Sequence, residues 1–162
     1  MSEELERCHT AALRILNYRF NSTEELRRKL RTRKFDSTVI DETLVRLTAE
    51  KWLDDERFAG ALVRTRQNKH LGPRRIARDL QVAGVPRESA DRAMKANADP
   101  ARQEEDLRAL YQKRLRMMIR RHGEEYAASP EARNKLAFYL LSKGYDAALV
   151  RSVVKETPVV DD

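Results

Sequence analysis

The residues of this sequence best suited to a chemical role are basic side chains gathered in three stretches without any acidic residue. The stretches are residues 27–34 with six lysines and arginines, residues 64–78 with six, and residues 113–121 with five. Lys and Arg bind phosphates and carboxylates, so the chemistry they indicate is recognition of an anionic partner. Each stretch could equally be a solvated helix face, and that alternative stays open.

Helical geometry selects the side chains of these stretches that point away from a buried face. At about 100° per residue, Arg28 and Arg31 lie furthest from the neighbouring leucines, and Arg74 and Arg78 lie furthest from the next apolar pair. The candidate residues for binding a partner or DNA are Arg28, Arg31, Arg64, Arg66, Lys69, Arg74, Arg75, Arg78, Lys113, Arg116, Arg120 and Arg121.

The other chemically active residue types lack the spacing that catalysis or metal binding needs. His9, His70 and His122 are far apart in the sequence and have no Cys, Asp or Glu at metal-ligand spacing. The Asp-Asp-Glu run at residues 54–56 could pass for a catalytic cluster, but carboxylates at a helix start also complement the helix dipole. No phosphate-binding glycine loop or activated nucleophile accompanies it. We therefore expect no metal, no cofactor and no enzymatic activity.

Composition favours a helix-rich protein with small cores. Of 162 residues, 36% are charged and 6% aromatic, with five Gly and five Pro, which argues against a β-sandwich or a Rossmann fold. The net charge of +7 favours an anionic partner such as nucleic acid or an acidic protein surface, although surplus charge also serves solubility.

Several features indicate the compartment. The single cysteine, Cys8, excludes an internal disulfide and fits a reducing environment. The N-terminus lacks the pattern of a signal peptide, and no apolar run approaches the roughly 18 residues that a membrane helix needs. The expectation is a cytoplasmic monomer without membrane contact.

Apolar residues spaced by three and four positions predict the helices. The first helix is expected over about residues 4–18. The second begins at Ser22, which can form a capping box with Glu25, and Asp36 or Ser37 can cap a third.

The middle of the chain predicts two more helices, and a further helix follows them. One begins near Asp54 and runs into Lys69, and another restarts at Pro73 and stops at Gly84. A long helix is expected over about residues 100–121, followed by a loop at residues 122–129.

A repeat appears when the chain is shifted against itself. Shifts of 50 and then 60 residues align Leu26 with Ile76 and Leu136, Leu30 with Leu80 and Leu140, and Lys34 with Gly84 and Gly144. Periods of this size are typical of linear arrays of small helical units. Chance alignment of helical stripes is the alternative, and the shared glycines argue against it.

We therefore predict an all-α fold, an elongated tandem array of three-helix repeats with about nine helices. The expected repeats are residues 1–52, 53–98 and 99–156, with a flexible tail at 157–162. Arg28 and Arg78 fall at equivalent positions, so successive repeats would present a basic track.

Three stretches carry a likeness to a known family. They are Ser-Thr-Glu-Glu-Leu at residues 22–26 followed by Leu30 and Phe35, Leu-Asp-Asp-Glu-Arg-Phe-Ala at 53–59, and Gly-Pro-Arg-Arg-Ile at 72–76 followed by Leu80, Gly84 and Val85. On these residues the sequence resembles the RecX family of small helical RecA regulators, over about residues 8–153. Lys34 departs from the pattern, because such proteins tend to have Gly between the second and third helices.

The resemblance implies a curved array of three-helix repeats that lies in the groove of a RecA filament on DNA. It further implies that the protein bridges RecA protomers and damps ATP hydrolysis and strand exchange, in homologous recombination, DNA repair and the SOS response. Weak contact with single- or double-stranded DNA would accompany that role.

Two other functions stay open. A Gly-interrupted helix pair with outward arginines also describes helix-turn-helix modules, so a stand-alone helical DNA-binding protein is one alternative. A structural adaptor is the other. No aromatic residue is placed for base stacking along the basic stretches, so any nucleic acid is expected to be held through its backbone.

Overall fold

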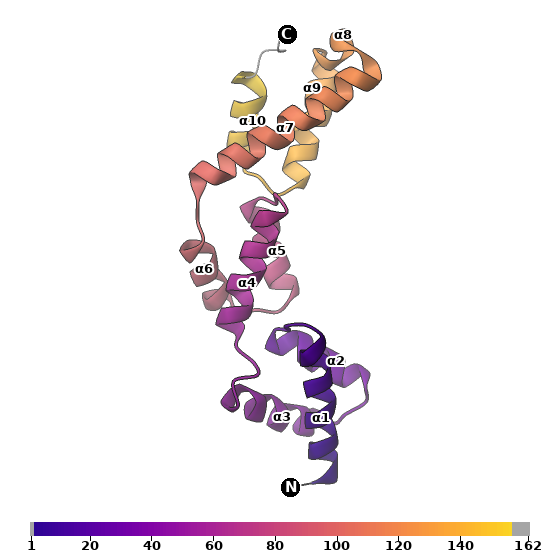
Figure 1. Ribbon diagram of the computed structural model, residues 1–162, viewed down its shortest axis with the longest axis vertical. Coiled ribbons are helices and arrows are strands. Elements are labelled where there is room, and N and C mark those ends of the chain that lie inside the picture. Colours follow the sequence, from indigo (N-terminus) through magenta and orange to yellow (C-terminus); the bar gives the residue numbers. More distant parts are fainter. Residues whose placement is uncertain (1, 157–162) are drawn as a thin grey trace. The chain divides into compact units, whose positions relative to one another are not determined.

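The computed structural model describes residues 2–156, and all regular secondary structure in that range is helical (Figure 1). This confirms the predicted all-α class. The helices in this range are α1 Glu3–Tyr18, α2 Thr23–Thr32, α3 Ser37–Ala49, α4 Asp55–Asn68, α5 Pro73–Val82, α6 Arg87–Ala96, α7 Pro100–His122, α8 Glu124–Ala127, α9 Pro130–Ser142 and α10 Ala147–Glu156. The tail predicted at 157–162 lies outside the described residues.

The predicted helix starts at Ser22 and Asp36 are confirmed. The Ser22 hydroxyl accepts a hydrogen bond from the Glu25 amide at 3.1 Å, and the Glu25 carboxylate accepts one from the Ser22 amide at 3.2 Å. Asp36 accepts one from the Thr38 amide at 3.0 Å and so caps α3. Each cap satisfies an amide that has no partner within its own helix.

One local prediction is wrong. The segment 122–129 was expected to be a loop, and it contains the one-turn helix α8, which brings the helices between residues 2 and 156 to ten instead of about nine. Ala127 is buried in a cluster with residues of α7 and α9. A single turn is too short to display a helical stripe, so hydrophobic periodicity does not reveal it.

The chain divides into two compact units. The first unit combines the residues up to Val63 with Asp79–Ala96, and the second combines Arg64–Arg78 with the residues from Asn97 onward. Helices α4 and α5 each contribute one part to each unit. The repeat boundaries after residues 52 and 98 stay a prediction.

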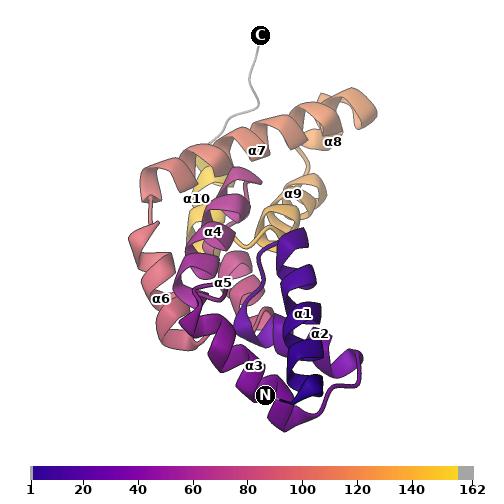
Figure 2. The same ribbon diagram turned by 60° about the horizontal axis from the view of Figure 1, so that its bottom comes forward.

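The first unit has its core between α1, α2 and α3, which lie together in both views (Figures 1 and 2). The predicted stripe of α1 is confirmed, because Leu5, Cys8, Ala12 and Ile15 are all buried. Burial raises the pKa of the Cys8 thiol. The core residues of this cluster are Cys8, Ala12, Ile15, Leu26, Leu30, Ile40, Leu44, Leu47 and Leu53. Each fully buried leucine contributes roughly 1.5–3 kcal/mol.

The second unit has its core between α7, α9 and α10. The long helix α7 buries Leu107, Tyr111 and Leu115. Tyr145, at the corner between α9 and α10, is 1% exposed, and its hydroxyl donates a hydrogen bond to the His70 carbonyl at 2.9 Å. The remaining members of this cluster are Ala127, Leu136, Leu140, Val150 and Val153.

The corners that end α2, α5 and α9 share one backbone conformation. Lys34, Gly84 and Gly144 have φ angles of +68°, +72° and +93°, in the left-handed region. The amide after the corner bonds back into the helix, as from Val85 to the Leu80 carbonyl at 3.1 Å. These three positions are the ones that the sequence shifts align, which supports the predicted repeat register.

Candidate functional site

Two junctions position the arginines predicted to bind a partner. The first junction, in the first unit, joins the start of α2 to the end of α5. The Ser22 hydroxyl donates a hydrogen bond to the Ala83 carbonyl, and the Arg28 guanidinium donates one to the Val82 carbonyl at 2.7 Å. Gly84 lies so close to α2 that a Cβ atom there would be 2.5 Å from the Cβ of Glu24. The first junction is therefore held by side chains of α2.

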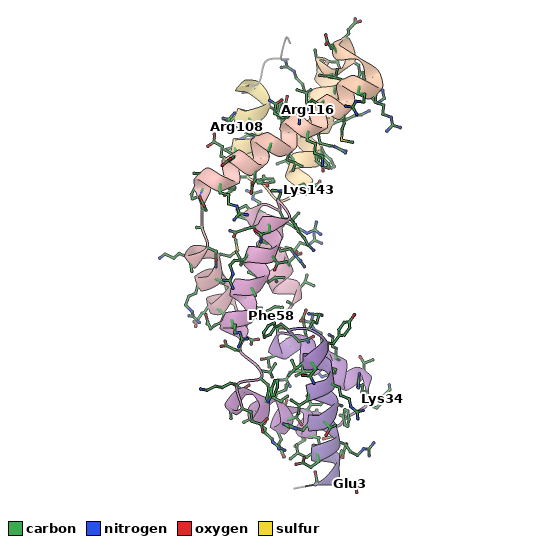
Figure 3. The ribbon with its side chains drawn as sticks, in the orientation of Figure 1. Glu3, Lys34, Phe58, Arg108, Arg116 and Lys143 are labelled. Atoms are coloured by element: carbon green, nitrogen blue, oxygen red, sulfur yellow. The ribbon has the colours of Figure 1, made fainter. Side chains whose placement is uncertain are left out.

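The second junction, in the second unit, joins the start of α5 to the end of α9. The Gly72 amide donates a hydrogen bond to the Lys143 carbonyl at 2.8 Å, and the Arg74 amide donates one to the Gly144 carbonyl at 3.1 Å; Lys143 is labelled in Figure 3. A Cβ atom on Gly144 would lie 2.4 Å from the Arg75 amide nitrogen. The second junction is therefore formed by backbone against backbone.

The backbone contact leaves several side chains of the stretch 64–78 available to a partner. Arg64, Lys69, Arg74 and Arg78 are exposed, and their side chains have no hydrogen-bond or ion-pair partner among residues 2–156. Two other candidates in this stretch, Arg66 and Arg75, each interact within the protein. The stretch thus presents positive charge from the end of α4 and the start of α5.

The start of α5 is electrostatically unusual. Its first turn contains Arg74 and Arg75 and no acidic residue, whereas the equivalent positions of α2 are Glu24 and Glu25. A helix N-terminus carries a partial positive charge, so cations there cost about 0.3–1 kcal/mol each where acids would be favourable. A bound anion would remove this cost.

The first half of the first basic stretch is engaged inside the protein. Arg27 pairs with Glu24 at 3.2 Å and also with Asp41. Arg28 is half-exposed and donates to Val82 in the first junction. The proposal that Arg28 faces a partner stays a prediction, but its guanidinium already has a structural role.

The remaining side chains of this stretch lie at the end of α2. Arg31, Arg33 and Lys34 are exposed and have no polar side-chain partner within the described part of the chain. Cations are favourable there, because the C-terminus of a helix is its negative end. Helix electrostatics alone therefore explain their position.

The third stretch forms one face of the second half of α7. Lys113, Arg116 and Arg120 recur at helical spacing and are exposed, as is Arg121. Figure 3 labels Arg116 in this half, and Arg108 in the first half, where Arg108 pairs with Glu104 at 2.9 Å. Charge on α7 thus changes from paired to uncompensated along its length.

The acidic run at residues 54–56 has structural partners, as expected of carboxylates at a helix start. Asp54 accepts a hydrogen bond from the Arg57 amide at 3.1 Å, and Asp55 accepts one from the Thr23 amide at 2.9 Å. Glu56 accepts one from the Ser89 hydroxyl at 2.8 Å, and its hydrogen bond with Arg92 lowers the pKa of its carboxyl.

The three histidines lie in separate places. His9 is buried with its Nε2 2.9 Å from a Glu50 oxygen, and the His122 ring lies 4.9 Å from the Tyr126 ring. His70 lies 3.4 Å from Asp106. Residues 2–156 contain no group of three or more His, Cys, Asp or Glu side chains that could hold a metal ion.

None of the helices between residues 2 and 156 combines the length and the apolar character that crossing a membrane requires.

The structure places one aromatic residue beside a basic stretch, although the sequence pattern does not indicate it. Tyr18 of α1 lines the same hollow as Lys29 and Arg33. Tyr18 is separated from that stretch by a turn and a helix start, so only the contact between α1 and α2 brings them together. No signal in the sequence shows this proximity.

The fold defines a class: an all-helical protein built from three-helix units. Comparison with family models gives two matches, to "RecX, first three-helix domain" over residues 8–47 and to "RecX, second three-helix domain" over residues 54–94.

Known relatives agree with these matches. The protein "Regulatory protein RecX" of Xanthomonas oryzae pv. oryzae is 32% identical over 148 residues, which cover 91% of this chain and 86% of the relative. The protein of the same name from Trichlorobacter lovleyi is 29% identical, over 92% of this chain and 94% of the relative. The chain belongs to the RecX family.

Solved structures show the same fold. The crystal structure of RecX from Lactobacillus salivarius matches with a TM-score of 0.79 at 24% identity, over 96% of this chain and 97% of that one. A crystal structure of regulatory protein RecX matches with a TM-score of 0.78 at 23% identity, over 95% of this chain and 73% of that one.

Proposed function

We propose that this RecX-family regulator binds in the groove of the RecA filament on DNA and inhibits RecA ATP hydrolysis and strand exchange. Membership of the family supports a regulatory role. The resemblance of the sequence motifs supports RecA as the target. A ligand that bridges protomers acts on more than one subunit, so inhibition is expected at substoichiometric concentration.

One observation carries the choice of binding surface. Arg74 and Arg78 stand on the first half of α5, exposed and without an ion-pair partner among residues 2–156. The contact to α9 uses the backbone of this segment and not these side chains. Because Arg74 lies in the first turn, its charge opposes the helix dipole, and an external anionic group stabilises it. We place the RecA-filament contact here, with Arg64 and Lys69 beside it.

Charge reversal at these two positions tests the proposal. The double variant Arg74→Glu/Arg78→Glu is expected to lose inhibition of DNA-dependent ATP hydrolysis by RecA. Its helicity should stay near that of the unchanged protein, and its melting temperature should stay the same or rise slightly, because Glu at position 74 complements the helix dipole that Arg74 opposes. Inhibition by the unchanged protein should weaken as salt is added, because salt screens exposed charges.

A matched control reverses two exposed basic residues elsewhere. Arg87→Glu/Lys95→Glu, on α6, makes the same change in net charge outside every basic stretch and should leave inhibition unchanged. An Arg74→Glu/Arg78→Glu protein that inhibits at the unchanged protein's concentrations would contradict this surface and direct attention to the basic face of α7. Unchanged hydrolysis together with tight binding to naked duplex would favour the stand-alone DNA-binding alternative.

A further inference from the structure

A hollow of about 640 Å³ lies in the first unit between α1 and the second half of α2. This size is in the usual range, about 300–1,000 Å³, for pockets that hold a small ligand or a ligand segment. Its lining residues are Arg14, Ile15, Tyr18, Lys29, Thr32 and Arg33.

One wall of the hollow is aromatic. Tyr18 is 90% exposed, and Ile15 beside it is buried in the core of the unit. The Tyr18 side chain has no hydrogen-bond or ring partner within residues 2–156. A flat apolar surface is therefore open to a ligand next to a rigid support.

The hollow also carries net positive charge, although the Glu25 carboxylate outside its lining acts on Lys29. None of its lining residues is acidic, and Arg14 and Arg33 are exposed without an ion pair in the described range. The Lys29 ammonium donates a hydrogen bond to the neutral Asn21 side chain at 2.6 Å. Burial, and then the nearby charge of Arg19, lowers the pKa of Lys29. An anion in the hollow would be attracted by three cations at once.

We infer that this hollow binds single-stranded nucleic acid, with one unpaired base stacked on Tyr18 and the flanking phosphates bound by Arg14 and Arg33. An exposed aromatic ring between cations is the combination by which proteins hold single strands, because every base has a face that can stack. A duplex keeps its bases stacked inside and offers only phosphates. An acidic peptide would use the cations but leave the ring face empty.

The site is independent of the RecA surface proposed above. It lies in the first unit and shares no residue with Arg64, Lys69, Arg74 and Arg78, which lie in the second. Failure of the strand-binding site would therefore leave the RecA proposal in place, and the strand test uses no RecA.

Fluorescence anisotropy with a labelled oligothymidylate of about a dozen nucleotides tests the inference. Tyr18→Ala is expected to weaken binding roughly tenfold, since stacking on one aromatic residue accounts for that much, and Tyr18→Phe is expected to bind like the unchanged protein. Arg14→Ala/Arg33→Ala should lower the slope of log affinity against log salt by about 1.4, for two lost phosphate contacts.

Two matched controls separate this site from general surface properties. Phe138→Ala removes another exposed aromatic ring, 76% exposed on α9, and should not change binding. Arg87→Ala/Lys95→Ala removes two exposed cations from α6 and should change the salt slope less than Arg14→Ala/Arg33→Ala does. Circular dichroism should show equal helicity for all variants.

Four outcomes would overturn the inference. Equal strand affinity of Tyr18→Ala and the unchanged protein would exclude stacking. Equal weakening by Tyr18→Phe would assign the effect to the hydroxyl group. Displacement of the strand by thymidine monophosphate at the strand's own concentration would show a mononucleotide site. If polyglutamate displaced the strand equally well from the unchanged protein and from Tyr18→Ala, the hollow would be a general anion-binding surface.

Discussion

The first and second junctions use the same backbone corner with different side chains. In the first, Ser22 and Arg28 of α2 reach the carbonyls at the end of α5. In the second, the equivalent residues are Gly72 and Arg78, and the amides of Gly72 and Arg74 make the contact. Because Gly72 has no side chain, the backbones meet directly, and a Cβ there would lie 2.4 Å from the Gly144 carbonyl group.

Because of this difference, Arg28 and Arg78 have different structural roles although they occupy equivalent positions in the repeat. Arg28 is used to hold one unit together, whereas Arg78 is left exposed because the backbone already holds the other junction. A surface for a partner can thus arise in a repeat protein without adding charge. An arginine becomes available to a partner when the junction that it stabilises in one repeat is held by backbone hydrogen bonds in another.

The largest expected effect is at the corner of the second junction. Gly144→Ala places a Cβ atom 2.4 Å from the Arg75 backbone at a φ of +93°. Left-handed strain of about 1–2 kcal/mol and overpacking of about 1–3 kcal/mol should together lower the free energy of unfolding by roughly 3 kcal/mol or more. Denaturant unfolding measures this. Lys34→Ala, at the exposed equivalent corner, is the control and should change stability little; equal losses at both corners would contradict the close approach.

The second effect concerns Tyr145, which follows this corner where the other repeats have Phe35 and Val85. Burial raises the pKa of the Tyr145 hydroxyl from 10.0 to about 12. A raised pKa contributes stability that is fully present below pH 10 and is lost as the pH rises through about 12. The protein should therefore lose helicity as the pH rises from 10 through about 12, as followed by circular dichroism. Tyr145→Phe should weaken this pH dependence and leave the part due to Tyr111, whose pKa burial also raises, and an unchanged alkaline transition would refute it.

A smaller effect should distinguish the two equivalent arginines directly. Arg28→Ala removes the hydrogen bond to the Val82 carbonyl and should cost about 1 kcal/mol of unfolding free energy. Arg78→Ala should stay within about 0.5 kcal/mol, since its side chain has no polar partner in residues 2–156. Thermal melting of the two variants provides the measurement. Equal losses would mean that the second junction also depends on its arginine.

The smallest effect is expected at Lys34. Lys34→Gly relieves left-handed strain of about 1–2 kcal/mol but adds chain entropy to the unfolded state worth about 0.4–1 kcal/mol. The net result should be a stabilisation of about 0.5 kcal/mol, measurable by denaturant titration. Destabilisation would show that the Lys34 side chain has a structural role at this exposed corner.

Much of the local structure follows from residues close together in the chain. The capping box of Ser22 and Glu25, the break before Pro73 and the buried stripe of α1 depend on contacts within a helical turn or two. The three corners at Lys34, Gly84 and Gly144 could be aligned from apolar spacing alone, and they share one conformation. The one-turn helix α8 was not predicted because its four residues span only about one helical period, and a stripe needs several.

The sequence predicted the candidate sites only in part. Helical arithmetic gives the direction of a side chain relative to its own helix, and it placed Arg28 and Arg78 alike. It does not show that the end of α5 supplies a carbonyl to Arg28, or that α1 brings Tyr18 beside Lys29 and Arg33.

The sequence by itself therefore determined the all-α class, the helix ends, the core stripes and the register of the corners, because each depends on spacing along one helix. Only the tertiary structure decided which arginines are free, where backbone replaces side chain at a junction, and which aromatic ring borders a basic stretch. These depend on which element lies opposite a side chain, and that is set by contacts between residues as far apart as Arg28 and Val82 or Gly72 and Lys143.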